Sequence, residues 1–199
     1  MRISWPQLWE NIMQCQNCSL GAGCIQKVPG QGDVHAPLML IGEGPGEQED
    51  KQGLAFVGPA GQLLTKMLSA IDLPRERVYI CNVVKCRPPR NRQPSPEEMQ
   101  ACIGHLRAQV ALVKPRVILL LGATAVSAVL GSDYRITRCH GQWIERKGYS
   151  IIATYHPSAL LRDESKKRDA WEDLKKVRQR LYELSLYPDL LEDKKDEHA

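Results

Sequence analysis

The sequence predicts an α/β fold in which helices cover both faces of a parallel sheet. Short apolar runs alternate with helical segments along the chain, and each run is continuously apolar rather than alternating with polar residues. Such runs are typical of strands buried on both faces, as parallel strands are in α/β proteins. We therefore expect four parallel strands, at residues 37–42, 77–85, 116–122 and 149–157.

The helices are predicted from an apolar stripe and from capping residues. The segment AGQLLTKMLSAI places its large apolar side chains on one helical face. Ser95, Pro96 and Glu98 form an N-cap, a first-turn proline and a capping box, which indicate where a long helix begins. The predicted helices cover residues 60–71, 95–113, 123–131 and about 164–186.

The chain length of 199 residues suits one domain, which we expect to span residues 1–187. Residues 188–199 are predicted to form a flexible charged tail, to which a replication or repair protein could bind. From residue 189 onward the net charge is −3, which leaves +7 on the rest of the chain. A basic body makes a polyanion such as nucleic acid a plausible partner.

The sequence also excludes two classes of protein. Its N-terminus lacks the basic and apolar regions of a signal peptide, and no apolar run is long enough to span a membrane. Seven cysteines cannot all pair within the chain, so a disulfide framework is not expected. We expect a cytoplasmic, monomeric protein that does not bind membranes and keeps its thiols reduced.

Four cysteines are candidate metal ligands. Cys15 and Cys18 form a Cys-x-x-Cys pair, and Cys86 and Cys102 enclose fifteen residues after the second predicted strand. Four thiolates suit tetrahedral zinc or an iron–sulfur cluster, and the wide, asymmetric spacing favours the cluster over compact zinc knuckles. Of the other cysteines, Cys24 lies near the first pair and is a rival ligand. Cys81 is predicted to be a core residue, and the role of Cys139 is left open.

Polar residues lie at the ends of three predicted strands, in otherwise apolar surroundings. Glu43 follows Gly42 after the first strand, Asn82 lies within the second, and His156 lies at the end of the fourth. In parallel sheets, ligands bind beyond the carboxyl ends of the strands. We therefore expect these residues to meet in one cleft.

Four motifs carry a resemblance to a known family. They are GEGPGEQED (42–50), GLAFVGPAGQLL (53–64), NVVKCRPPRNR (82–92) and HPSALLR (156–162). Together they resemble the family 4 uracil-DNA glycosylases, the iron–sulfur type found in bacteria and archaea. The similarity runs from Cys15 to about Arg162, which is most of the chain.

The resemblance implies a fold, a reaction and a cofactor. The fold is a three-layer α/β/α sandwich with a central four-stranded parallel sheet. The reaction is the first step of base excision repair, in which uracil is flipped out of single- or double-stranded DNA and its N-glycosidic bond is hydrolysed, leaving an abasic site. The loop 85–95 has no histidine, so covalent trapping of DNA is not expected. The cofactor is a structural [4Fe-4S] cluster held by Cys15, Cys18, Cys86 and Cys102.

Phe56, Asn82 and His156 are the implied uracil-binding side chains. Phe56, the only phenylalanine, lies in a glycine-flanked loop, and the resemblance implies that it stacks on the base. The Asn82 amide can accept from uracil N3–H and donate to O4, a pattern that cytosine reverses. His156 is implied to contact uracil O2 and to stabilise the leaving anion.

The glycine-rich loop 42–50 is expected to supply backbone amides to uracil and to position the attacking water. Family 1 enzymes have Asp and Tyr where this chain has Gly44 and Gly46, so the water-activating carboxylate is open; Glu43 is the first choice. The rival carboxylates are Glu47 and Glu49. The predicted catalytic residues are Glu43 and His156, and the predicted substrate-binding residues are Gly42, Glu43, Gly44, Glu49, Phe56, Asn82 and His156.

DNA contacts are predicted around the mouth of the cleft. Leu160 is the expected wedge that enters the duplex where uracil leaves it, and Leu161 is the alternative, while either could instead be a core contact. Basic side chains there would bind phosphates without sequence preference. The predicted phosphate-binding residues are Arg87, Arg90, Arg92 and Arg162, with Lys85, Lys166, Lys167 and Arg168 in the same two patches.

Two other functions fit part of the sequence. A non-catalytic nucleic-acid-binding module would use the basic residues, but it needs no polar residues gathered at strand ends. An electron carrier would use the cluster, but it needs neither a wedge nor a base pocket. Incubation with a uracil-containing oligonucleotide, followed by alkali to cleave any abasic site, separates these hypotheses.

Overall fold

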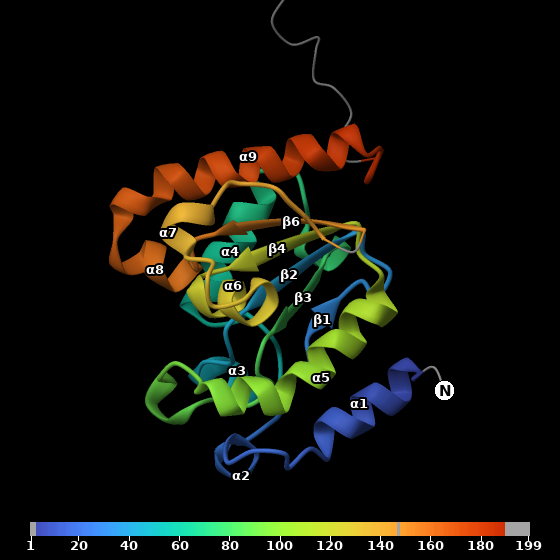
Figure 1. Cartoon of the computed structure of the whole chain (residues 1–199), viewed down its shortest axis with the longest axis vertical. Coiled ribbons are helices and arrows are strands. Elements are labelled where there is room, and N and C mark those ends of the chain that lie inside the picture. The colour runs from blue at the N-terminus through green and yellow to red at the C-terminus, as the bar shows by residue number, and fades with distance from the viewer. Residues whose placement is uncertain (1–2, 147, 190–199) are drawn as a thin grey trace, which may run out of the picture.

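The computed structural model describes residues 3–146 and 148–189, within which six strands form one sheet in the order β1-β3-β2-β4-β6-β5 (Figure 1). The strands are β1 (Gln31–Gly32), β2 (Leu38–Gly42), β3 (Tyr79–Asn82), β4 (Val117–Leu121), β5 (Ile144–Arg146) and β6 (Tyr149–Thr154). Strands β3, β2, β4 and β6 pair in parallel, whereas β1 and β5 pair antiparallel at the two edges. The α/β class is confirmed, but the sheet is mixed and six-stranded rather than a parallel sheet of four strands.

The two edge strands escape prediction because they are short and partly exposed. β1 has two residues and β5 has three, and neither contains an apolar run. Each one covers the backbone groups of an inner strand that would otherwise lie at the edge. The four predicted strands are the inner ones, and the second of them ends at Asn82 rather than at residue 85.

The predicted helices are present, with several shorter ones between them. The Ser95 hydroxyl accepts from the Glu98 amide at 3.3 Å and the Glu98 carboxylate accepts from the Ser95 amide at 2.8 Å, so the capping box is formed. The α-helices are α1 (Trp5–Met13), α2 (Leu20–Gly23), α3 (Glu47–Gln52), α4 (Pro59–Ser69), α5 (Pro96–Val113), α6 (Ala123–Leu130), α7 (Ile136–Cys139), α8 (Pro157–Arg162) and α9 (Lys167–Glu183). The 3₁₀ helices are η1 (Arg75–Arg77), η2 (Pro89–Asn91) and η3 (Glu164–Lys166).

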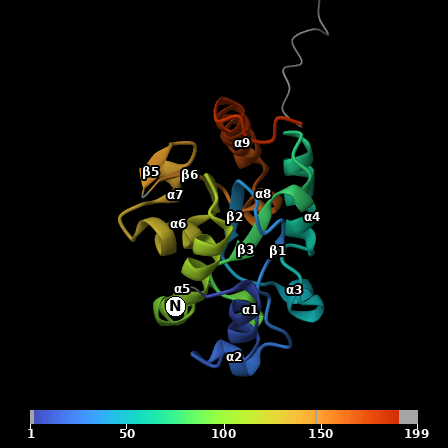
Figure 2. The same ribbon diagram turned by 90° about the vertical axis from the view of Figure 1, so that its right-hand side faces the viewer.

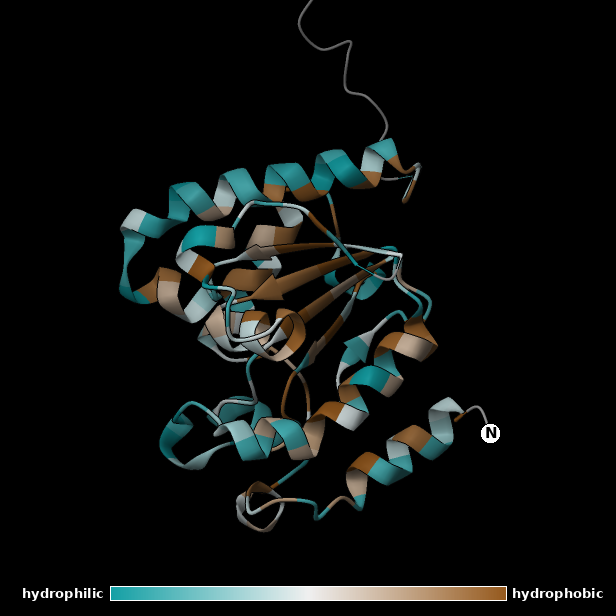
Figure 3. Ribbon diagram, viewed as in Figure 1, coloured by the Kyte–Doolittle hydropathy of each residue, from teal (hydrophilic) through white to brown (hydrophobic). Residues whose placement is uncertain are grey.

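Alternate residues of the inner strands enter two separate cores, which places the sheet between two layers of helices. In β2, Leu38 and Leu40 belong to one core, and Met39 and Ile41 belong to the other. The first core includes residues of α4, α8 and α9, and the second includes residues of α5, α6 and α7. Figure 2 shows α4 on one side of the sheet and α5 and α6 on the other, and Figure 3 shows the apolar strands between them.

The strand order places a topological switch point between β2 and β4. The chain passes from β2 to β3 on one side and then crosses to β4 on the other side of β2. Gly42 is the register partner of Asn82, and Leu121 is the register partner of Thr154, so the four inner strands end at the same edge. Ligands of open α/β sheets bind at such an edge, outside the switch point.

Residues that follow α9 are tied to the sheet by Tyr187. Its hydroxyl donates to the Arg77 carbonyl at 2.9 Å and accepts from the Leu38 amide at 3.2 Å. Asp189, in the predicted tail, pairs with Arg77 at 2.8 Å. Residues 190–199 lie outside the described residues, and with them most of the tail that we predict to be flexible and to bind a partner. No helix in the described ranges is both long and apolar enough to cross a membrane.

Candidate functional site

Gly42, at the end of β2, is the point where the side chains of Phe56 and Asn82 meet. A Cβ atom at Gly42 would lie 2.5 Å from Asn82 Oδ1 and 2.5 Å from Phe56 Cζ, closer than real Cβ contacts. Only glycine therefore leaves room for both side chains. Gly44 is packed in the same way, since a Cβ atom there would lie 2.7 Å from Val84 Cγ2.

His156 approaches the same place from the end of β6. The centroids of the His156 and Phe56 rings are 5.7 Å apart, with an interplanar angle of 32°. Gly122, which follows β4 with a φ of 89°, permits this approach, because a Cβ atom there would lie 2.8 Å from His156 Cβ. The structure thus brings Phe56, Asn82 and His156 together at one edge of the sheet.

Asn82 carries a buried polar atom without a partner. The residue is 1% exposed, and its Oδ1 accepts no hydrogen bond from the described residues. A buried polar group left unpaired costs about 1–3 kcal/mol. An amide kept in this state at a strand end is suited to a ligand that donates a hydrogen bond.

His156 is held as a neutral hydrogen-bond donor. Desolvation, followed by the charge of Arg162, lowers the pKa of His156 to about 4. Its Nδ1 accepts from the Ser158 amide at 3.1 Å, and the Ser158 hydroxyl lies 2.8 Å from the same nitrogen. A nitrogen that accepts from an amide carries no proton, so the neutral ring keeps its proton on Nε2. His156 can therefore donate to a ligand oxygen without carrying a charge.

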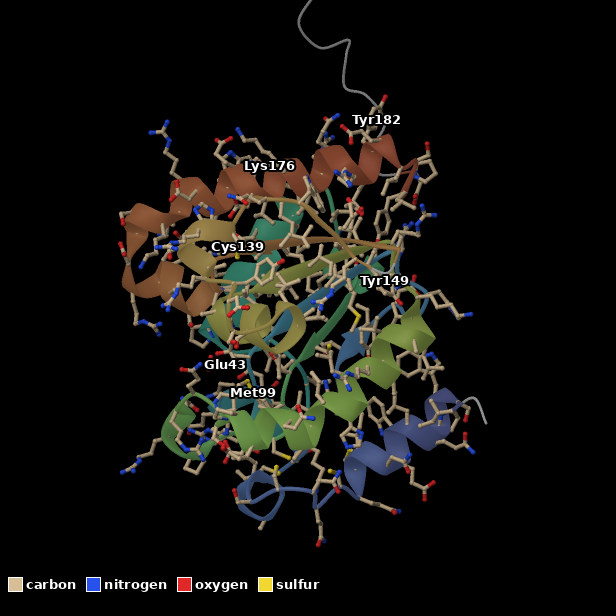
Figure 4. All side chains as sticks on the ribbon, viewed as in Figure 1. Glu43, Met99, Cys139, Tyr149, Lys176 and Tyr182 are labelled. Carbon is tan, nitrogen blue, oxygen red and sulfur yellow. The ribbon has the colours of Figure 1, made fainter. Side chains whose placement is uncertain are left out.

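Glu43 is held by a hydrogen bond from Thr124, and Gln93 in turn supports Thr124. Thr124, in the first turn of α6, donates from Oγ1 to Glu43 Oε2, and Gln93 Nε2 donates to Thr124 Oγ1 at 3.1 Å. Figure 4 shows Glu43 between α6 and the first turns of α5 in this view. The bond from Thr124 fixes Oε2. Oε1 takes no part in it and can accept a hydrogen bond from a water molecule.

The two rival carboxylates have other roles. Glu47 is exposed and pairs with Lys51 at 2.6 Å on the surface of α3. Glu49 is buried and accepts three backbone amides. These amides belong to Gly46 at 3.2 Å, Val57 at 2.8 Å and Gly58 at 2.7 Å. Glu49 therefore organises the loop that carries Phe56, and its oxygens are engaged by the protein.

Leu160, the expected wedge, does not suit that role in this structure. It is 2% exposed and belongs to the core formed with α4 and α9. Removing a leucine side chain from a core costs about 2–5 kcal/mol, so Leu160 cannot readily leave it. Leu161, the alternative, is 50% exposed. Successive residues of a helix point in different directions, and α8 turns Leu160 inward and Leu161 outward.

The predicted phosphate-binding residues differ in how available their charges are. Arg90, in the middle of η2, and Arg162, at the end of α8, are both exposed. Arg92 forms a bidentate pair with Glu98, at 2.8 Å and 2.6 Å, which lowers the pKa of that carboxyl to about 2. Arg87 is largely covered, with 22% of its side chain exposed. Arg90 and Arg162 therefore present positive charge more freely than Arg87 and Arg92.

The four predicted metal ligands line one cavity. Cys15 and Cys18 lie between α1 and α2, Cys86 follows β3, and Cys102 lies on α5. Among the described residues, no three His, Cys, Asp or Glu side chains are grouped closely enough to hold a single metal ion. The structure thus shows the thiols around a common space, and their residue types fit a tetrathiolate centre.

Lys85 is buried beside these thiols, not in the surface patch predicted for it. It is 2% exposed, lines the same cavity, and donates from Nζ to the Asn82 carbonyl at 2.5 Å. Burial raises the pKa of the Cys102 thiol, and the Lys85 ammonium opposes this shift. No salt bridge joins Lys85 to a carboxylate within the described ranges. A buried cation is costly without an anion, and metal-bound thiolates would supply that negative charge.

The remaining cysteines take three different positions. Cys81 is fully buried in β3, which confirms that it is a core residue. Cys139 is buried at the end of α7. Cys24 lies next to Cys86. The pKa of the Cys86 thiol is raised mainly by burial and further by its hydrogen bond with Cys24. Cys24 thus remains the rival ligand by position.

Sequence reasoning missed the residues that form hydrogen bonds to the site residues and hold them in place. The contact with Ser158 could have been found, because a strand-end histidine before proline can act as N-cap and accept from the backbone amide two residues later. Thr124 and Gln93 gave no such signal, since the bonds from Gln93 to Thr124 and from Thr124 to Glu43 join segments far apart in the chain. Arg75, which binds the backbone of the Phe56 loop, lies 19 residues from Phe56 and gave no signal either.

Comparisons with known proteins agree with these features. A model of the Uracil DNA glycosylase superfamily matches residues 29–175. A type-4 uracil-DNA glycosylase of Thermotoga maritima is 46% identical over 85% of this chain and 90% of its own length. The corresponding protein of Archaeoglobus fulgidus is 41% identical over 87% and 92%, respectively. A type-5 uracil-DNA glycosylase of Pyrobaculum aerophilum is 35% identical over 67% of this chain and 66% of its own length.

We expect His156 to titrate near pH 4 and to keep its neutral proton on Nε2. Because the folded pKa lies below the ordinary value of 6.5, the residue stabilises the fold fully above about pH 6.5, and this contribution is lost as the pH falls towards 4. Ring-nitrogen NMR of histidine-labelled protein measures both properties, and His156→Gln assigns the signals. A ring that is charged at pH 6, or protonated on Nδ1 when neutral, would contradict this.

Proposed function

The chain belongs to the uracil-DNA glycosylase superfamily, and on that premise we propose that it flips uracil out of single- or double-stranded DNA and hydrolyses the N-glycosidic bond, leaving an abasic site. The observation that carries the proposal is the unpartnered Oδ1 of Asn82, buried where Phe56 and His156 converge. The names of the type-4 relatives support uracil in DNA as the substrate. Residues 1–187 are proposed to act as one catalytic domain.

Asn82 is proposed to select uracil by its edge. Uracil N3–H donates to Oδ1, and the Asn82 amide group donates to O4. Cytosine has an acceptor at N3 and an amino group at C4, so both contacts would become repulsive or unpaired. Because Asn82 is buried, water cannot replace the lost bonds, and discrimination is strong.

Phe56 and His156 are proposed to hold the base and stabilise it as it leaves. The Phe56 ring stacks on uracil, a contact worth about 1–3 kcal/mol. His156 donates from Nε2 to O2, where negative charge gathers as the bond to C1′ breaks. A neutral donor that is already in place needs no reorganisation during the reaction, which is how such contacts lower a barrier.

Glu43 is proposed to bind the attacking water and accept its proton. The water oxygen forms a bond to C1′, and the electron pair of the N1–C1′ bond leaves with uracil. Thr124, supported by Gln93, holds Oε2 and so directs Oε1 towards the water. The Gly42 and Gly44 backbone is proposed to approach the base from the same loop, because neither residue has a side chain of its own to intervene.

The cofactor is proposed to be a [4Fe-4S] cluster bound by Cys15, Cys18, Cys86 and Cys102. When bound, it would supply a rigid cross-link and no electrons, because glycosidic hydrolysis is not a redox reaction. The cross-link would join the segment after α1 to the loop after β3, which carries Arg90 and Gln93. The burial of Lys85 among the thiols supports an anionic centre.

Arg90 and Arg162 are proposed to bind DNA phosphates, with Arg87 and Arg92 contributing less because they are covered or paired. Leu161 is proposed as the wedge in place of Leu160, because it is the exposed leucine of α8. It lies five residues after His156, so a side chain inserted in the stack would be close to the vacated base position.

Asn82→Ala should lower the single-turnover rate of uracil excision by about 10- to 100-fold, because two hydrogen bonds to the base are lost. The rate is measured on a uracil-containing oligonucleotide by alkaline cleavage of the abasic product. Asn11→Ala, on the exposed side of α1, serves as the control and should excise at the normal rate. A wild-type protein that binds DNA but leaves uracil in place would refute the enzymatic proposal.

Protein purified without oxygen should contain about four iron atoms and four sulfides per chain. Replacing Cys15, Cys18, Cys86 or Cys102 by serine should remove most of this iron. Cys139→Ser, which replaces a buried cysteine of α7, is the matched control and should retain the iron. Cys24→Ser tests the rival ligand and should also retain the iron. Zinc in place of iron would overturn the cluster, and iron loss in Cys24→Ser would change the ligand set.

Leu161→Ala should slow excision from double-stranded DNA by about tenfold more than from single-stranded DNA, because only a duplex must be opened and kept open. Leu160→Ala should instead lower the free energy of unfolding by about 2–5 kcal/mol. Excision from both substrates and urea unfolding are measured for each variant. Equal slowing of Leu161→Ala on both substrates would show that Leu161 is not a wedge.

A further inference from the structure

Phe56 has a backbone conformation that its residue type disfavours. Its φ is 54°, in the left-handed region, which is uncommon for a bulky aromatic residue. Such a conformation persists only where the surroundings impose it. The residues that impose it therefore decide where the Phe56 ring lies.

Arg75 binds the carbonyl side of this loop. Its Nη1 donates to the Phe56 carbonyl at 2.9 Å, and its Nη2 donates to the Ala55 carbonyl at 2.9 Å. Nη1 also donates to Thr65 Oγ1 at 3.0 Å, which ties the guanidinium to α4. The Ala55 carbonyl accepts a second bond from Gln31 Nε2 at 2.7 Å. Arg75 is thus the residue that binds the Phe56 carbonyl and joins it to α4.

Glu49 binds the amide side of the same loop. Its Oε1 accepts from the Val57 amide at 2.8 Å and from the Gly58 amide at 2.7 Å. The peptide group between Phe56 and Val57 therefore donates to a carboxylate and accepts from a guanidinium. Opposite charges at its two ends oppose rotation of this peptide, and with it a change in the Phe56 backbone.

The orientation of this peptide matters because the ring has little freedom at its other end. Phe56 Cζ lies over Gly42 beside Asn82, and the ring faces His156. A rotation of the Phe56 backbone would carry the ring away from Gly42 or against Asn82. Either movement would misplace the surface on which a base stacks.

We propose that Arg75 is a positioning residue that, opposite Glu49, holds Phe56 in its left-handed conformation and so prepares the stacking surface for uracil. This inference rests on the proposed function and names a residue beyond it. Arg75 touches neither the base nor the reacting atoms. Its effect on uracil must therefore pass through Phe56, which a double-mutant cycle can test.

The cycle combines Arg75→Gln with Phe56→Ala and measures the inhibition constant of free uracil, which reports the base pocket without the rest of the DNA. Arg75→Gln alone should weaken inhibition about tenfold, within the loss expected for a stacked base. In the Phe56→Ala background, the same substitution should change the constant by less than about twofold. Affinity for a uracil-free oligonucleotide should be unchanged in both backgrounds.

Arg77→Gln is the matched control, because Arg77 lies on the same 3₁₀ helix and pairs with Asp189 at the surface. It should not alter uracil inhibition. Arg75→Lys should give a smaller loss than Arg75→Gln, since an ammonium keeps the charge but lacks the fork that reaches both carbonyls. Thermal unfolding followed by circular dichroism verifies that each variant is folded.

Three results would overturn the proposal. Unchanged inhibition in a folded Arg75→Gln would show that Arg75 does not position the ring. Equal losses with and without Phe56 would assign Arg75 a general structural role, as would failure of both Arg75 variants to fold. Absence of uracil excision by the wild-type protein is a separate result, which refutes the proposed function itself.

Discussion

The absence of a side chain at Gly42 is the constraint on which the rest of the site depends, because three segments approach the end of β2 closely. Phe56 and Asn82 occupy the space that a Cβ atom would need. Gly122 allows His156 the same close approach from β6. An alanine at either glycine would push an aromatic ring or an imidazole outward, and these groups would no longer face one ligand.

Around this point, each functional group keeps hydrogen-bonding capacity free for a ligand. Asn82 keeps an unpaired Oδ1, His156 accepts at Nδ1 and so can donate from Nε2, and Glu43 is held through Oε2. The supporting bonds come from residues that do not touch the ligand position. Leaving polar groups unpaired costs free energy in the free protein. A complementary ligand restores the missing hydrogen bonds when it binds, and the groups are already in place to stabilise it.

Lys85 connects the base-reading strand with the thiol cavity. Its ammonium binds the Asn82 carbonyl and lies among the thiols, so one buried cation serves two neighbouring features. From sequence, Lys85 is interpreted as one of the surface residues around residue 87 that contact DNA. Burial changes its role because a cation inside the protein must be matched by negative charge nearby.

The sequence by itself determined the four inner strands, the capped helix α5 and the polar residues at the strand ends, because apolar runs, capping patterns and the polar residues that follow a run are local features. The cysteine spacing also predicted candidate metal ligands, with Cys24 left as the rival. Only the tertiary structure decided that Leu161 rather than Leu160 faces outward, that Glu49 organises a loop, and that Arg75 and Thr124 support Phe56 and Glu43. Those properties depend on which residues from distant segments become neighbours and on the direction in which each side chain points, and a linear pattern specifies neither.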